Sequence, residues 1–60
     1  MTAKELEKII RKDGWIPVSQ KGSHRQYEHP TKPGQVTIPI HKGDIKKGTA
    51  NSILRQAGLK

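Results

Sequence analysis

The residues best suited to chemistry lie between Ser19 and Tyr27, where His24 follows a short basic turn that contains Lys21 and Gly22. An imidazole titrates near neutrality, so it can accept and return a proton at physiological pH. The chain has no cysteine nucleophile, no close pair of carboxylates and no glycine-rich phosphate loop. His24 is therefore the first candidate for a general base.

A ribonuclease that needs no metal fits this set of side chains. It requires a base for the ribose 2′-hydroxyl, cations for the phosphate and an acid for the leaving 5′-oxygen. DNA lacks the 2′-hydroxyl, so the mechanism is restricted to RNA. His24 can supply the base, and His41 is the candidate acid. The phosphate-binding candidates are Lys21, Arg25, Lys42, Lys46 and Lys47, with Ser23 and the backbone amides near Gly22 as neutral donors.

The other readings of these residues are structural. Three histidines could suggest a metal, but they lack a recognised ligand spacing and have few acids nearby, so we expect no metal site and no cofactor. His29, which precedes Pro30, is expected to pack in a turn. The Ser23 hydroxyl could bond its own turn. Trp15 and Tyr27 are expected in the core, because the chain has no phenylalanine.

The charge of the chain points to an anionic partner. Its 60 residues include 12 Lys and Arg against 5 Asp and Glu, a net charge of +7. A domain this basic is expected to bind nucleic acid or an acidic protein. The chain has no apolar run long enough for a membrane span or a signal peptide, so we expect a cytoplasmic protein with a single domain over residues 1–60.

Sequence patterns predict the elements that position these residues. Thr2 to Glu5 forms a capping box, and an apolar stripe follows until Gly14 ends the first helix. Thr49 is the expected N-cap of a second helix that ends at Gly58. Between them, three strands joined by short turns predict an antiparallel meander, irregular or at an edge near Pro17. The predicted strands are Trp15–Gln20, His24–His29 and Gln35–His41.

The fold class predicted by this order is α+β, with an α-β-β-β-α arrangement and both helices on one face of a three-stranded antiparallel sheet. Val36, Ile38 and Ile40 should then face the helices, as should Tyr27 on the neighbouring strand. His24 and His41 should both point to the open face of the sheet. A register shift or a bulge would undo this placement.

Several blocks of the chain resemble the HicA toxin family. They are Asp13-Gly14-Trp15, Gly22-Ser23-His24, Ile38-Pro39-Ile40-His41-Lys42-Gly43, Ile45-Lys46-Lys47-Gly48-Thr49 and Ile53-Leu54-Arg55-Gln56-Ala57-Gly58. The resemblance implies a double-stranded-RNA-binding-domain-like fold and an mRNA interferase held inactive by a HicB antitoxin. It also implies that His24 is the catalytic histidine. The acid role of His41 is not part of the resemblance.

The sequence thus favours a type II toxin that cleaves mRNA, monomeric when free and bound by a HicB-type antitoxin over the open sheet face. One alternative is a module of the same fold that binds RNA without cutting it. Another is a protein whose main role is to bind an acidic partner. Charge alone does not separate these functions, whereas turnover of RNA does.

Overall fold

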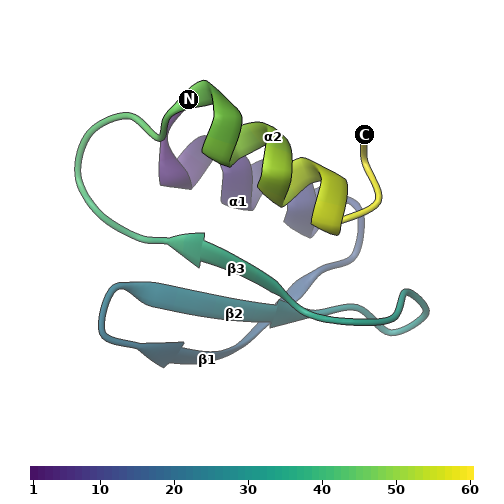
Figure 1. The fold of residues 1–60 in the computed structure, drawn as a ribbon. Helices are drawn as coiled ribbons and strands as arrows, with labels where there is room; N and C mark the ends of the chain where they lie inside the picture. Colours follow the sequence, from purple (N-terminus) through teal and green to yellow (C-terminus); the bar gives the residue numbers. More distant parts are fainter.

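The computed structural model describes residues 1–60 and has the predicted α-β-β-β-α order. The elements are α1 (Ala3–Lys12), β1 (Ile16–Lys21), β2 (His24–Glu28), β3 (Val36–Pro39) and α2 (Lys47–Gln56). Both helices cover one face of the sheet and leave the other face open (Figure 1). The predicted α+β, double-stranded-RNA-binding-domain-like fold is confirmed. Neither helix is long and apolar enough to cross a membrane.

Helix α1 begins at the predicted capping box. The Thr2 amide donates to Glu5 Oε1 at 2.8 Å, and the Glu5 amide donates to Thr2 Oγ1 at 3.1 Å. These two bonds satisfy amides that the first turn of a helix leaves without partners. The helix buries Leu6 and Ile10, and Gly14 follows it with a φ of 114° that favours glycine.

The sheet has the order β1-β2-β3, so the strand that carries His24 is central. His24 pairs with Lys21 on one side and with Pro39 on the other. Strand β1 is an edge strand with a bulge between Pro17 and Ser19, which confirms the irregularity expected there. The β1–β2 turn has two central residues, and its Gly22 has a φ of 57°, as a tight hairpin turn requires.

The segment between β3 and α2 differs from the sequence prediction. Strand β3 ends at Pro39, so His41 lies in the following loop and not in a strand. The loop leaves the sheet to reach the helix layer, where the Ile45 amide donates to the Met1 carbonyl at 2.6 Å and Ile45 is buried. The strand itself ends at Pro39 because its only partner, β2, begins at His24, directly opposite Pro39.

Helix α2 begins earlier than predicted. Its N-cap is Lys46, and the first helical bond runs from the Ala50 amide to the Lys46 carbonyl at 2.9 Å. Thr49 lies inside the first turn, so the prediction of Thr49 as N-cap is wrong. No side chain caps this helix, and its first turn contains no acidic residue.

The core fills the space between the helices and the sheet. Trp15 and Tyr27 are 1% and 0% exposed, which confirms that both are core residues. The Trp15 indole also donates to the Ala57 carbonyl at 3.2 Å, joining the end of α2 to the start of β1. The rest of the core is aliphatic and comprises Ala3, Leu6, Ile10, Val36, Ile38, Ile45, Ala50, Ile53 and Ala57.

Candidate functional site

His24 is exposed at the start of β2, beside the β1–β2 turn. Its neighbours in the strand settle its direction, since Tyr27 is buried and Arg25 contacts Glu7 of α1. Alternate residues of a strand point to opposite faces, so His24 points to the open face of the sheet. Its ring makes no hydrogen bond within the chain, which leaves both ring nitrogens available to a ligand.

The β1–β2 turn next to His24 is held by hydrogen bonds that two of its carbonyl groups accept. Gln20 Nε2 donates to the Gly22 carbonyl at 3.0 Å, and the Ile40 amide donates to the Ser23 carbonyl at 2.5 Å. The Ser23 hydroxyl is exposed and has no partner within the chain, so it does not bond its own turn. A rigid turn with a free hydroxyl beside an imidazole can donate a hydrogen bond to an anion.

His41 lies near the β1–β2 turn, because its neighbour in the chain, Ile40, is hydrogen-bonded to Ser23 of that turn. The His41 ring is exposed, and its Nδ1 lies 3.0 Å from the Lys42 carbonyl. A carbonyl only accepts hydrogen bonds, so Nδ1 carries a proton and Nε2 faces no partner in the chain. The alternation that placed His41 on the open face does not apply, since the residue is outside β3.

Four of the predicted phosphate-binding lysines gather at one end of the molecule. Lys21 pairs with His24, Lys42 lies in the loop after β3, and Lys46 and Lys47 begin α2. The β1–β2 turn, this loop and the start of α2 lie at the same end in Figure 1. All four side chains are exposed, and none forms an ion pair.

The start of α2 adds donors that the sequence prediction missed. A helix N-terminus has unpaired amides and a partial positive charge, and both attract anions. Here neither a capping side chain nor an acidic residue satisfies them, and Lys46 and Lys47 stand beside them. The sequence prediction missed these unpaired amides because it assigned Thr49 as the N-cap. Two lysines where a helix start usually carries acids were the available signal.

Arg25 is the predicted phosphate-binding residue that the structure does not bring to this group. It lies on the helix-facing side of β2, where its Nη1 is 2.7 Å from Glu7 Oε2 and its Nε donates to Gln20 Oε1 at 3.0 Å. The Tyr27 hydroxyl donates to the same Glu7 carboxylate. We call Glu7, Gln20, Arg25 and Tyr27 the Glu7 network.

The Glu7 network shifts the titration of its members. The hydrogen bond from Tyr27, followed by the Arg25 charge, holds the pKa of Glu7 below its ordinary value. The bond to Glu7 raises the pKa of Arg25. Burial and the nearby carboxylate raise the pKa of Tyr27 to about 12. These groups stabilise one another, so Arg25 has a structural partner that the lysines near His24 lack.

His29 lies at the opposite end of β2, and its side chain is only 9% exposed. Its Nδ1 accepts from the Thr31 and Lys32 amides at 3.0 and 3.1 Å, so Nε2 carries the proton and donates to the Asp13 carbonyl at 2.7 Å. The ring also meets Trp15 edge to face, with centroids 5.2 Å apart. His29 therefore packs in a turn, as its position before Pro30 predicted.

Lys32 completes this second polar group. Its Nζ is 2.5 Å from Asp13 Oδ2 and 3.1 Å from the Ala57 carbonyl. The bond from Lys32 holds the pKa of Asp13 below its ordinary value. We call Asp13, His29 and Lys32 the His29 cluster. The three histidines of the chain do not converge, and no group of His, Cys, Asp or Glu side chains is arranged to hold a metal ion.

Comparisons with known proteins agree with this description. A family model described as the HicA toxin of bacterial toxin-antitoxin matches residues 3–59. A solved structure described as a toxin-antitoxin complex from Streptococcus pneumoniae contains a chain that is 38% identical, with a TM-score of 0.83. That match covers 98% of this chain and 98% of the other. No curated protein matches this chain.

Proposed function

Because this chain belongs to the HicA toxin family of bacterial toxin–antitoxin systems, we propose that it is a metal-independent endoribonuclease that cleaves mRNA. One observation carries the proposal: His24 is exposed and unbonded near lysines that form no ion pair, whereas Arg25 and His29 have partners within the chain. An imidazole without a structural role, placed beside phosphate-binding groups, is arranged for proton transfer.

In the proposed reaction, neutral His24 takes the proton of a ribose 2′-hydroxyl. The oxygen attacks the adjacent phosphorus, and the bond from phosphorus to the 5′-oxygen breaks. Lys21 and the Ser23 hydroxyl stabilise the charge on the phosphoryl oxygens. His41, protonated on both ring nitrogens, gives a proton to the leaving 5′-oxygen from Nε2. The products are a 2′,3′-cyclic phosphate and a 5′-hydroxyl.

The RNA backbone continues from the turn towards the helix layer. Lys42 is on the connecting loop, and the uncapped start of α2 offers amides together with Lys46 and Lys47. Phosphates bind well at such a helix start, and this contact carries no base specificity. Arg25 has no part in this path, because Glu7 holds it on the other side of β2.

We also propose that a HicB-type antitoxin neutralises the toxin by covering the open sheet face and His24. The similar solved structure is a toxin-antitoxin complex, which supports an antitoxin as partner. An acidic surface on that partner would offset the net charge of +7. The free toxin is proposed to be a monomer.

The test is cleavage of single-stranded RNA in EDTA by the wild-type protein and by His24→Ala, with the end groups identified. The proposal expects cyclic-phosphate ends from the wild type and a large loss of rate in the variant. A mock purification from cells without the toxin gives the contaminant background. Equal cleavage by both proteins would refute the role of His24. Tight RNA binding without cleavage by either protein would indicate a binding module.

A further inference from the structure

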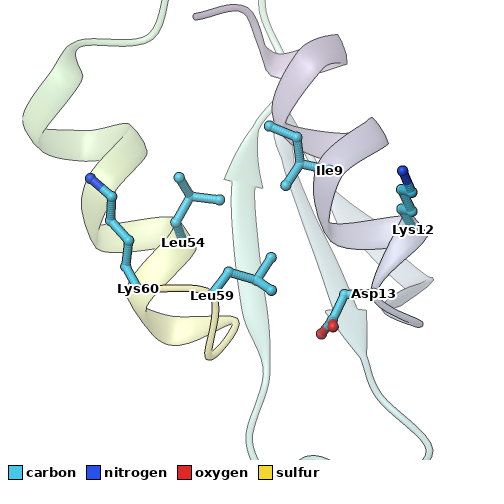
Figure 2. A pocket seen from close by; sticks show the side chains of 6 residues that line it. All are labelled: Ile9, Lys12, Asp13, Leu54, Leu59 and Lys60. Atoms are coloured by element: carbon cyan, nitrogen blue, oxygen red, sulfur yellow. The ribbon is translucent and has the colours of Figure 1, made fainter.

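A groove lies between the C-terminal halves of the two helices, on the side of the molecule away from the open sheet face. It has a volume of about 560 Å³, and Figure 2 shows Ile9 of α1 facing Leu54 and Leu59 across it. Lys12 and Lys60 stand at its two sides, and Asp13 lies at one end. We call this feature the helix groove.

The apolar side chains that form the floor of the helix groove are only partly buried against the core. Ile9 and Leu59 remain 38% and 37% exposed, and Leu54 packs against the core from its edge. Ile9 belongs to the apolar stripe of α1, yet it faces the groove while Leu6 and Ile10 are fully buried. Covering these side chains would remove further apolar surface from water, which favours association.

The rim of the helix groove is positively charged. Asp13 is neutralised by Lys32 at 2.5 Å, which leaves Lys12 and Lys60 as the cations without an ion-pair partner; Lys60 Nζ donates one hydrogen bond, to Asn51 Oδ1 at 2.7 Å. The positive surface continues over the outer side of α1, where the acid Glu7 is bound to Arg25. The residues exposed on that side are Lys4, Lys8, Arg11 and Lys12.

The floor distinguishes a protein ligand from RNA. Proteins hold single-stranded nucleic acid by stacking its bases on aromatic side chains, and both Trp15 and Tyr27 are buried in the core. A floor of branched aliphatic side chains suits aliphatic groups, and a rim of lysines suits carboxylates. The matching ligand is a segment that carries an aliphatic residue flanked by acids.

We propose that the helix groove binds an acidic, amphipathic segment of the antitoxin, with an aliphatic side chain on Ile9, Leu54 and Leu59 and carboxylates on Lys12 and Lys60. This inference rests on the proposed function for the existence of that partner. It adds a second contact, separate from the cover over His24. The β1–β2 turn and the helix groove are at opposite ends of the molecule, so neutralisation can be weakened here without touching catalysis.

The experiment measures the affinity of the purified toxin for the HicB-type antitoxin encoded with it, by calorimetry, together with RNA cleavage by the free toxin. The test variants are Ile9→Ser and Lys12→Glu. Leu59→Ser serves as a second apolar variant, because Leu59 lies outside α2 and its loss should spare the helix. Lys4→Glu is the matched control, since it makes the same charge change at the far end of α1. Circular dichroism confirms that each variant is folded.

The proposal expects each test variant to lose about tenfold or more in antitoxin affinity, as interface anchors do. Cleavage of RNA by the free variants should match the wild type, and Lys4→Glu should bind within about twofold of the wild type. Wild-type affinity in all test variants would overturn the proposal. Equal losses in Lys4→Glu and Lys12→Glu with none in Ile9→Ser or Leu59→Ser would also overturn it, because only overall charge would matter.

The outcomes also separate this proposal from the proposed function. Loss of cleavage in Lys12→Glu or Ile9→Ser, with antitoxin affinity retained, would assign the groove to RNA and refute our inference. If the wild-type protein does not cleave RNA but the test variants lose antitoxin affinity, the groove contact stands and the ribonuclease proposal fails.

Discussion

One histidine begins strand β2 and another directly follows its end, and the two differ in exposure and in hydrogen bonding. At one end His24 is exposed and makes no hydrogen bond within the chain. At the other end His29 is nearly buried, and both of its ring nitrogens bond to the backbone. The imidazole of His24 thus has no partner in the chain, whereas that of His29 is fully hydrogen-bonded and joins a turn to the core.

The lysines repeat this contrast. Lys21, beside His24, has no partner, whereas Lys32, beside His29, is held by Asp13 and by the Ala57 carbonyl. Partly buried polar groups are costly unless they are hydrogen-bonded, and each member of the His29 cluster has such partners. Charge therefore does not separate Lys21 from Lys32, whereas their hydrogen-bonding partners do.

The largest expected effect is on catalysis. Replacing His24 with Ala should lower the rate of RNA cleavage by about 10²- to 10⁴-fold, because the proposed general base is lost. The free energy of unfolding should change by less than about 0.5 kcal/mol, as for an exposed residue without contacts. Cleavage kinetics and urea unfolding measure the two quantities. A large loss of stability in this variant would break the comparison.

The matched change at the other end should have the opposite result. His29→Ala removes the bonds to Asp13, Thr31 and Lys32 and leaves a cavity beside Trp15, so we expect a loss of about 2–3 kcal/mol in stability. Trp15 is the only tryptophan, and its fluorescence follows unfolding in urea. Cleavage by the folded variant should equal that of the wild type. Inactivity in a folded His29→Ala protein would contradict the structural role.

A pH titration tests whether the Glu7 network, like the His29 cluster, stabilises the fold. The pKa of Tyr27 rises from 10.0 to about 12 on folding, so the folded state favours the neutral phenol. This contribution is complete below pH 10 and is lost as pH rises from 10 to about 12. We expect wild-type stability to fall by about 1–2 kcal/mol more than that of Tyr27→Phe over this range.

The measurement is urea unfolding at several alkaline pH values in both proteins. Tyr27 is the only tyrosine, so the absorbance of its phenolate reports its titration directly. Parallel stability curves for the wild type and Tyr27→Phe would contradict the burial and bonding described for this side chain.

The smallest effect distinguishes the two lysines. Lys21→Ala should reduce the slope of log affinity for single-stranded RNA against log salt by about 0.7, because one phosphate contact is lost. Its stability should not change. Lys32→Ala should leave that slope unchanged and cost about 0.5–1 kcal/mol in stability. Salt titrations of RNA binding measure the slopes, and an equal change in both variants would remove the distinction.

Local patterns predicted the parts of this fold that depend on near neighbours. The capping box of Thr2 and Glu5 needs only residues three positions apart, and the burial of Tyr27 followed from alternation along one strand. The failure at the end of β3 involves a distant partner. Strand β3 ends before His41 because its only partner, β2, begins at His24 opposite Pro39, a register that no local pattern of the loop reveals.

For the candidate site, too, the sequence placed some residues together and missed the contacts of others. His24 and its neighbouring lysines lie together because the turn and α2 are at one end of the sheet, as the element order required. The engagement of Arg25 could not be predicted, since its partner Glu7 is on another element 18 residues away. The uncapped start of α2 was missed because Thr49 has the residue type of a cap, while the fold starts the helix at Lys47.

The packing of His29 over Gly14 restricts how this protein can change over evolutionary time. A Cβ atom at position 14 would lie 2.7 Å from His29 Nε2, and Gly14 also has a φ of 114°. A side chain at position 14 would therefore meet both the imidazole and a backbone conformation that favours glycine. Replacing His29 relieves only the collision, so glycine stays favoured at position 14 even in a His29 variant. Two independent constraints thus act on position 14, whereas the exposed side chains of Ser23 and His24 have no partner in the chain and face neither.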